Sequence, residues 1–127
     1  MKRVIVTALD SRVGILRQKV GAAAERLARR EKGTSFEVYL GSDRFMKKNV
    51  LAFPAPEGFP HPDIAGGKFL GEIYLNPFYI KRKGEDLLFM LIHGYLHLLG
   101  YDHIKKGDRM AMERRERSLL ALLRGKR

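Results

Sequence analysis

The sequence predicts an α/β (α+β) protein in which a small mixed sheet packs against one central apolar helix. Short β-branched or alternating apolar runs are interleaved along the chain with segments whose apolar residues recur at helical spacing. The chain has 127 residues, enough for one core, so we expect a single domain over residues 1–127. Hydrophobic residues make up 45% of the chain, which argues against intrinsic disorder.

The N-terminal part predicts a strand, a helix and a second strand. Residues 3–9 are largely β-branched and apolar, which is typical of a strand. Asp10 or Ser11 can cap a helix with a basic outer face, whose apolar residues recur at helical spacing until Gly33 ends it. Residues 35–40 alternate between apolar and polar side chains and predict the second strand.

The middle of the chain is rich in turn-forming residues. Residues 41–43 predict a turn that caps a short helix through Lys48, and residues 50–53 form a short apolar run that Pro54 ends. Residues 54–68 hold four prolines and three glycines, so they predict a loop. A loop of this length in a compact domain is usually functional or mobile.

The C-terminal half predicts one more strand and two helices. Residues 69–75 return to a strand pattern. Residues 86–99 predict a helix that is apolar on nearly all sides and therefore central, with Gly100 just past its end. Residues 106–124 predict a last helix with apolar residues inward and many arginines outward.

The net charge limits the kind of molecule that the chain can bind, and the cysteine content limits the chemistry of its sites. Lys and Arg number 25 against 14 Asp and Glu, so the net charge of +11 favours a polyanion such as nucleic acid, or an anionic surface. Cysteine is absent, which excludes disulfides, thiolate metal sites and cysteine nucleophiles.

The most apolar stretch, residues 87–99, is too short to span a bilayer, and the N-terminus lacks a signal-peptide pattern. We therefore expect a soluble cytoplasmic protein without a membrane partner.

Three of the four histidines, His93, His97 and His103, fall in the run HGYLHLLGYDH. Four residues turn a helix by about 400°, so the first two imidazoles leave the same face one turn apart. Gly100 then breaks the helix and lets His103 approach from another direction. Three neutral nitrogen ligands with one open position are typical of a catalytic zinc site. The alternative is that these histidines are core residues satisfied by polar partners.

The same spacing, His-x-x-x-His-x-x-Gly-x-x-His, is the metzincin zinc motif with one departure. Metzincin proteases carry a glutamate after the first histidine as general base, and Gly94 stands there instead. The pattern thus predicts a metzincin-like metal site but argues against a peptidase. Asp102, beside the third histidine, can orient an imidazole or can cap the last helix.

These residues resemble the signature of the YbeY family of bacterial metal-dependent endoribonucleases, His-Gly-x-Leu-His-Leu-x-Gly-Tyr-Asp-His. The matching positions are His93, Gly94, Leu96, His97, Leu98, Gly100, Tyr101, Asp102 and His103. Residues 49–54 (NVLAFP) and 70–73 (LGEI) are similar to two further family segments, and the last helix is similar from Met112 through Glu116 to Leu119. The resemblance covers the chain from about residue 36 onward.

The resemblance implies a single YbeY-like metallohydrolase domain with one Zn²⁺ ion on the three histidines; nickel or another divalent metal is the alternative. It implies single-strand-specific RNA cleavage in maturation of the 16S ribosomal RNA 3′ end and in ribosome quality control. The implied partners are small-subunit ribosomal RNA and ribosome-associated proteins, and not DNA.

The substrate side departs from the family pattern. The segment before Val50 is shortened and lacks the family's Tyr-Arg pair, so Arg44, Lys47 or Lys48 would supply the cation that stabilises charge on the phosphate. Glu72, where the family has Asp, is either a general base or a solvent-facing strand residue. A non-catalytic, metal-stabilised RNA-binding module and, with less support, a metzincin-like protease stay open as alternative functions.

Overall fold

The computed structural model describes residues 3–31, 33–56, 68–101 and 106–125. The elements are, in order, β1 (Val4–Ala8), the 3-10 helix η1 (Ser11–Leu16), α1 (Arg17–Arg30), β2 (Thr34–Leu40), β3 (Val50–Pro54), β4 (Lys68–Leu75), α2 (Pro77–Arg82), α3 (Leu87–Leu98) and α4 (Lys106–Leu123).

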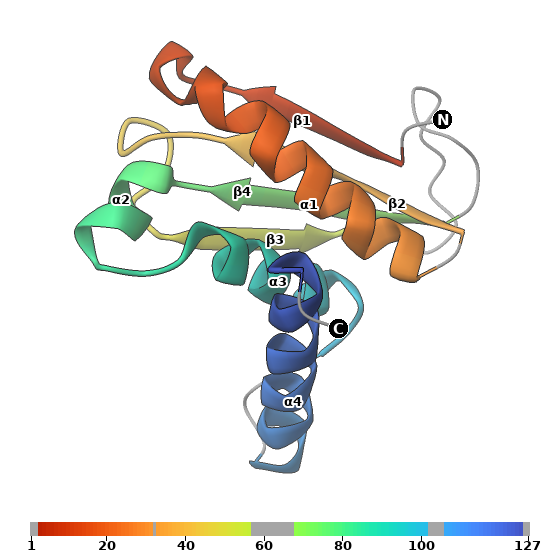
Figure 1. Ribbon diagram of the computed structural model, residues 1–127. Helices are drawn as coiled ribbons and strands as arrows, with labels where there is room; N and C mark the ends of the chain where they lie inside the picture. Colours follow the sequence, from red (N-terminus) through yellow and green to blue (C-terminus); the bar gives the residue numbers. More distant parts are fainter. Residues whose placement is uncertain (1–2, 32, 57–67, 102–105, 126–127) are drawn as a thin grey trace.

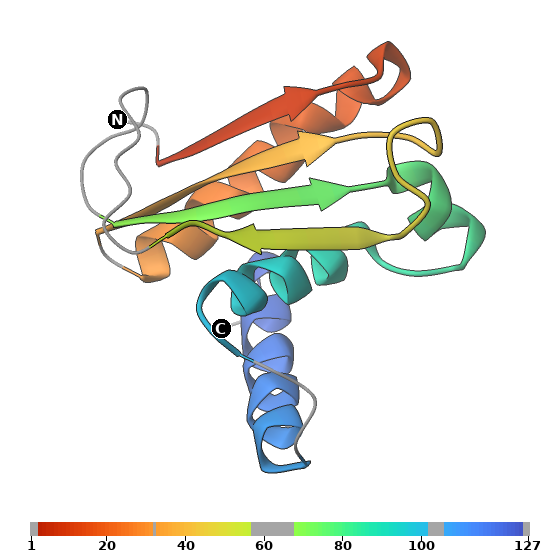
Figure 2. The ribbon, with the colours of Figure 1, turned by 180° about the vertical axis from the view of Figure 1, so that it is seen from behind.

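The strands form one mixed sheet in the order β1-β2-β4-β3. β1, β2 and β4 are parallel to one another, and β3 runs antiparallel to β4 at the edge. α1 covers the β1 side and α3 the β3 side of one face, while α4 projects away from the sheet (Figure 1). Seen from behind, the other face carries no helix among the described elements (Figure 2). The predicted small mixed sheet with a helix packed against it is confirmed.

The core lies between the sheet and the two helices that cover it. Phe36, Val38 and Ile73 are fully buried on the covered face, as their alternation along the strands predicts. Tyr95 of α3 is also fully buried, packs against Phe36 with ring centroids 5.3 Å apart and the rings tilted by 43°, and donates its hydroxyl to the Leu27 carbonyl of α1. This hydrogen bond joins the two covering helices.

The predicted helix after β1 forms in two parts. Asp10 caps η1 by accepting from the Arg12 backbone N–H, and the chain then continues into α1. Hydrogen bonds from the side chain and backbone of Arg12 hold the pKa of the Asp10 carboxyl well below its usual range. Gly33, just beyond the helix, has a φ of +79°, which explains why glycine stands at the reversal into β2.

The short helix predicted through Lys48 is wrong. Residues 43–45 form a turn, in which the backbone N–H groups of Phe45 and Met46 both donate to the Ser42 carbonyl. Asp43 does not cap a helix, because its carboxylate accepts hydrogen bonds from Asn76 and Arg82.

A short helix forms instead at α2, where the sequence predicts only the end of a strand. The Asn76 side chain accepts from the Tyr79 N–H, and Pro77 occupies the first turn, where its missing N–H has no cost.

The last helix is confirmed and ends at Leu123. Met112 and Leu119 are buried on its inner face, as predicted. Among the described residues, none of the helices combines the length and the apolar character needed to cross a membrane.

Candidate functional site: a histidine pair on α3

Local signals set both ends of α3. The Asp86 side chain accepts from the Leu88 N–H at the start of the helix. At its end, Gly100 has a φ of +101°, and the Gly100 and Tyr101 N–H groups bond to the carbonyls of His97 and Leu96. This Schellman-type ending lies within one turn of His97, so the chain reverses direction beside the histidines.

Gly94 determines how closely α3 approaches the sheet. A Cβ at this position would lie 2.8 Å from the Ile73 Cγ2 atom and 3.2 Å from the Val50 Cγ2 atom. The helix therefore packs so closely against β4 and β3 that any larger residue would force the Ile73 side chain to shift. For the same reason a glutamate at position 94 would crowd the Ile73 side chain.

His93 and His97 lie on the same side of α3, as their spacing predicts. Their Nε2 atoms are 3.2 Å apart, and the rings are inclined at 77° with centroids 4.7 Å apart. Two nitrogen ligands of a tetrahedral zinc ion, each about 2.0–2.1 Å from the metal, are about 3.3 Å apart. The pair is therefore spaced as two ligands of one metal ion.

Glu116 of α4 is a residue that sequence reasoning missed. Its side chain is buried, with only 7% of the residue exposed, and its Oε2 atom lies 2.7 Å from the Nδ1 atom of His93. With Nδ1–H donated to this carboxylate, the Nε2 atom of His93 keeps its lone pair for a metal. The sequence did hold a signal for Glu116, because this charged residue lies on the inner face of its helix together with the apolar residues Met112 and Leu119.

The histidine pair opens into a groove beside the edge strand β3. The groove has a volume of about 450 Å³ and is lined by Lys48, Asn49, most of β3, His93, Gly94 and His97. Of the three cations predicted from the sequence, Lys48 is thus the one that lines this groove with the histidines. Arg44 is exposed in the turn at residues 43–45 and does not belong to this lining.

Glu72 lies on the opposite face of the sheet from the histidines. Its neighbour Ile73 faces α3, so alternation turns Glu72 to the face without a helix. There it accepts a hydrogen bond from Tyr74, whose ring stacks on Tyr39, and Tyr39 in turn donates to Glu37. Burial and the neighbouring glutamates raise the pKa of both phenols. The strand-residue interpretation of Glu72 is therefore the one that agrees with its position, and a general-base role at the histidines does not.

The remaining predicted site residues lie outside the described residues. These are Asp102 and His103. Within the described ranges, no three His, Cys, Asp or Glu side chains gather into a group that could hold a metal ion. The third ligand and the metal itself therefore stay predictions.

Fold and site together define a class, a mixed α/β domain that holds a helix-borne histidine pair beside an edge strand. The family model described as "Endoribonuclease YbeY" matches residues 37–124, so the chain belongs to the YbeY family, as the sequence motifs indicate.

Curated relatives agree with this assignment. The chain is 44% identical to an "Endoribonuclease YbeY" of Rhodopseudomonas palustris over 85 residues, which cover 59% of this chain and 49% of the relative. It is 37% identical to a protein of the same name from Geobacter sulfurreducens over 98 residues, covering 67% of this chain and 61% of the relative. The chain thus spans about half the length of the curated relatives it matches.

Proposed function

We propose that the chain is a metal-dependent endoribonuclease that cleaves single-stranded RNA. The observation that carries this proposal is the pair of Nε2 atoms, 3.2 Å apart in a groove that also contains Lys48, in a chain of the YbeY family. We further propose the finer role implied by the family resemblance, which is maturation of the 16S ribosomal RNA 3′ end and ribosome quality control in the cytoplasm.

The donor set suits a divalent metal ion. His93, His97 and His103 would hold it through neutral imidazole nitrogens, a set that suits Zn²⁺ and also Ni²⁺. When bound, such an ion lowers the pKa of a water ligand toward neutrality and polarises a phosphoryl oxygen.

The chain's own residues support this chemistry in two ways. Glu116 accepts the Nδ1–H of His93, which orients the ring and fixes the tautomer that leaves Nε2 as a ligand. Lys48 lines the same groove and places a positive charge where a phosphate would lie against the histidines. The net charge of +11 draws the RNA toward the protein as a whole.

The test compares cleavage of a single-stranded RNA and a stable hairpin by wild type, His97→Ala and His61→Ala. The last variant removes the histidine outside the HGYLHLLGYDH motif and is the matched control. We expect the single strand to be cut by wild type and by His61→Ala. Activity should fall at least a hundredfold in His97→Ala and after chelation, with RNA binding retained.

Two outcomes would contradict the proposal. Cleavage that persists in His97→Ala would indicate a contaminating nuclease. RNA binding by the metal-loaded wild type without any cleavage would favour the non-catalytic RNA-binding module.

A further inference from the structure

Among the described strands, β3 is the edge of the sheet that lies along the histidine groove. Every second residue of an antiparallel edge strand turns its backbone groups away from the neighbouring strand. The Asn49 carbonyl accepts from the Asn76 N–H, and the Ala55 N–H donates to the Leu70 carbonyl. The odd-numbered residues 49–55 therefore face β4, and the backbone groups of residues 50, 52 and 54 point outward along the free edge.

Most of the outward donors on this edge are already used or missing. The side-chain oxygen of Asn49 accepts from the Val50 N–H at 2.7 Å, while the Asn49 amide group donates to Glu85 at 3.1 Å. Pro54 has no N–H to offer. In the described part of the chain, the Ala52 N–H is thus the outward donor of β3 that stays available, and the Ala52 carbonyl lies beside it on the same edge.

The histidine groove includes this edge. Its lining contains Leu51 as well as Ala52, whose side chains lie on opposite faces of the strand, so the groove extends over the edge between them. Ala52 pairs with Ile73, which faces α3, and therefore lies on the histidine side. The backbone donor and acceptor of Ala52 thus line the same groove as His93 and His97.

The pattern of donors and acceptors limits what can bind along β3. The outward carbonyl oxygens of Val50, Ala52 and Pro54 are all acceptors, and so are the oxygens of a phosphate, which they therefore repel. A peptide added as a strand needs a row of donors and acceptors, and the described edge offers it one free donor. The side chains of β3 in the groove are apolar. This surface suits a flat, uncharged group that carries a donor beside an acceptor.

We propose that Ala52 holds an unpaired nucleobase of the RNA by its Watson–Crick edge, an inference that rests on the proposed function. The Ala52 N–H donates to an acceptor of the base, and the Ala52 carbonyl accepts from a base N–H. Each of the four bases carries a donor next to an acceptor on this edge, and the edge is free only where the base is unpaired. The contact therefore makes the groove select single strands, while Lys48 is left for a neighbouring phosphate.

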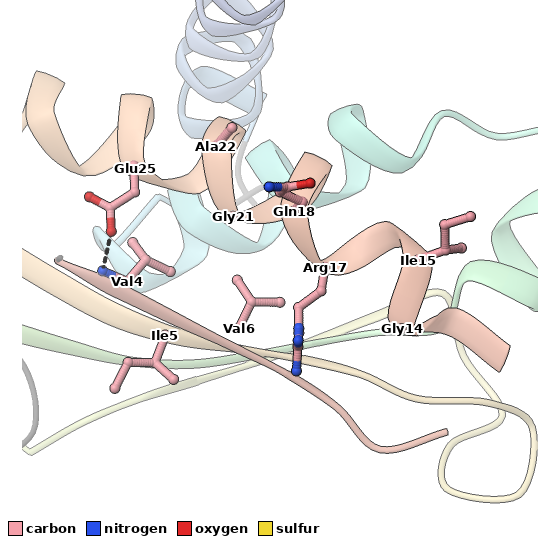
Figure 3. Close-up of a pocket in the computed structure, with 10 residues that line it drawn as sticks. All are labelled: Val4, Ile5, Val6, Gly14, Ile15, Arg17, Gln18, Gly21, Ala22 and Glu25. Carbon is pink, nitrogen blue, oxygen red and sulfur yellow. Dashed lines mark hydrogen bonds between the residues drawn. The ribbon is translucent and has the colours of Figure 1, made fainter. Parts of the chain in front are cut away.

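The groove at the opposite edge of the sheet, beside β1, is unsuited to RNA. It is larger, at about 940 Å³, but Glu25 of α1 lines it and accepts from the Val4 N–H (Figure 3). A carboxylate at this edge repels the phosphates that accompany every base. The described residues that line this groove include no histidine. Charge and position therefore both favour β3 as the strand that contacts the base.

An amide-to-ester exchange tests the contact without changing a side chain. Lactic acid in place of Ala52 keeps the methyl group and replaces the N–H by oxygen. The same exchange at Ala55 removes an N–H that bonds within the sheet, to Leu70, and is the matched control. Ala52→Pro removes the same N–H in a recombinant chain, and Pro54 shows that this side of the strand accepts proline. Circular dichroism confirms that each variant folds.

The ligands are two 2′-O-methylated oligouridylates, and fluorescence anisotropy gives the dissociation constant of each. One carries a methyl group at N3 of every base, on the Watson–Crick edge, and the other carries it at C5, away from that edge. We expect wild type to bind the C5-methylated strand about fivefold more tightly. The ester at Ala52 should weaken binding of this strand about fivefold and of the N3-methylated strand less than about twofold. The ester at Ala55 should keep the wild-type preference.

Three results would overturn the proposal: equal affinity of wild type for the two strands, no binding of either strand, or an ester at Ala52 that leaves both dissociation constants unchanged. Failure of the proposed cleavage is read separately, with an oligouridylate that keeps its 2′-hydroxyl groups. A wild type that prefers the C5-methylated strand through Ala52 but leaves this RNA uncut would support the base contact and refute the nuclease.

Discussion

α1 and α3 cover the same face of one sheet, and each turns a glycine toward a strand, yet the two contacts differ. A Cβ at Gly21 of α1 would lie 3.7 Å from the Val6 Cγ2 atom, an ordinary contact, whereas at Gly94 of α3 it would lie 2.8 Å from Ile73. α1 has a basic outer face, and α3 is buried on most sides while carrying two histidines. The histidine site thus depends on how tightly α3 packs, and the α1 side leaves room for other contacts.

Outside the histidines themselves, the largest effect is expected from the buried carboxylate of Glu116, which contacts His93. Glu116→Ala removes the acceptor of the His93 Nδ1–H, so we expect Zn²⁺ affinity to fall by about 10–100-fold. Isothermal titration calorimetry gives the affinity, and ¹⁵N NMR of the imidazole shows the loss of the single tautomer. Glu116→Gln, which keeps an oxygen acceptor, should lose less.

The control lies on the same helix. Glu113 is exposed on α4, so Glu113→Ala should leave metal affinity and tautomer unchanged. Equal losses in Glu113→Ala and Glu116→Ala would mean that the charge of the helix, and not the contact with His93, affects the site.

Alanine substitutions at Gly94 and Gly21 test how much more closely α3 packs on the sheet than α1 does. Gly94→Ala forces a methyl group against the buried Ile73 side chain and should cost about 1–3 kcal/mol of unfolding free energy while weakening Zn²⁺ binding. Gly21→Ala has space and removes a helix-weakening glycine, so it should stabilise by about 0.5–1 kcal/mol. Urea unfolding measures both. Similar effects of the two substitutions would refute the tight-packing interpretation of α3.

A smaller effect is expected from the hydrogen bond that joins the helices. Tyr95→Phe keeps the ring but removes the hydroxyl that donates to the Leu27 carbonyl, so we expect a loss of about 1 kcal/mol. Tyr74→Phe removes a longer, 3.3 Å bond on the face without a helix and should cost less. Thermal unfolding of the two variants ranks them, and a larger cost for Tyr74→Phe would reverse this ranking.

The smallest effect is expected at Asp43, in the turn away from both helices. Hydrogen bonds from Arg82 and Asn76 lower the pKa of this carboxyl, so its ionised form stabilises the fold above its ordinary pKa. That contribution is lost as the pH falls through the lowered pKa of the folded state. Asp43→Asn should therefore be slightly less stable than wild type near pH 7 and converge with it in acid. Parallel stability curves down to acid pH would contradict this assignment.

The sequence predicted the features that depend on residues close together in the chain. The strands follow from alternation, and the common side of His93 and His97 follows from helical geometry. Glu116 was missed because its partner His93 lies 23 residues away on another helix. The helix expected after residues 41–43 fails for the same reason, since Asp43 binds Arg82, 39 residues along the chain. Likewise, the sequence could not show which face of the sheet α3 covers. Glu72 lies away from the histidines because its side chain is on the opposite face.

The most direct test of the central claim is a zinc titration of the metal-free chain by calorimetry, with wild type, His97→Ala and His61→Ala measured side by side. The histidine pair predicts one tight site per chain in wild type and in His61→Ala, and its loss in His97→Ala. Undiminished tight binding by His97→Ala would show that the metal is held elsewhere and would contradict the assignment of the α3 histidines as its ligands.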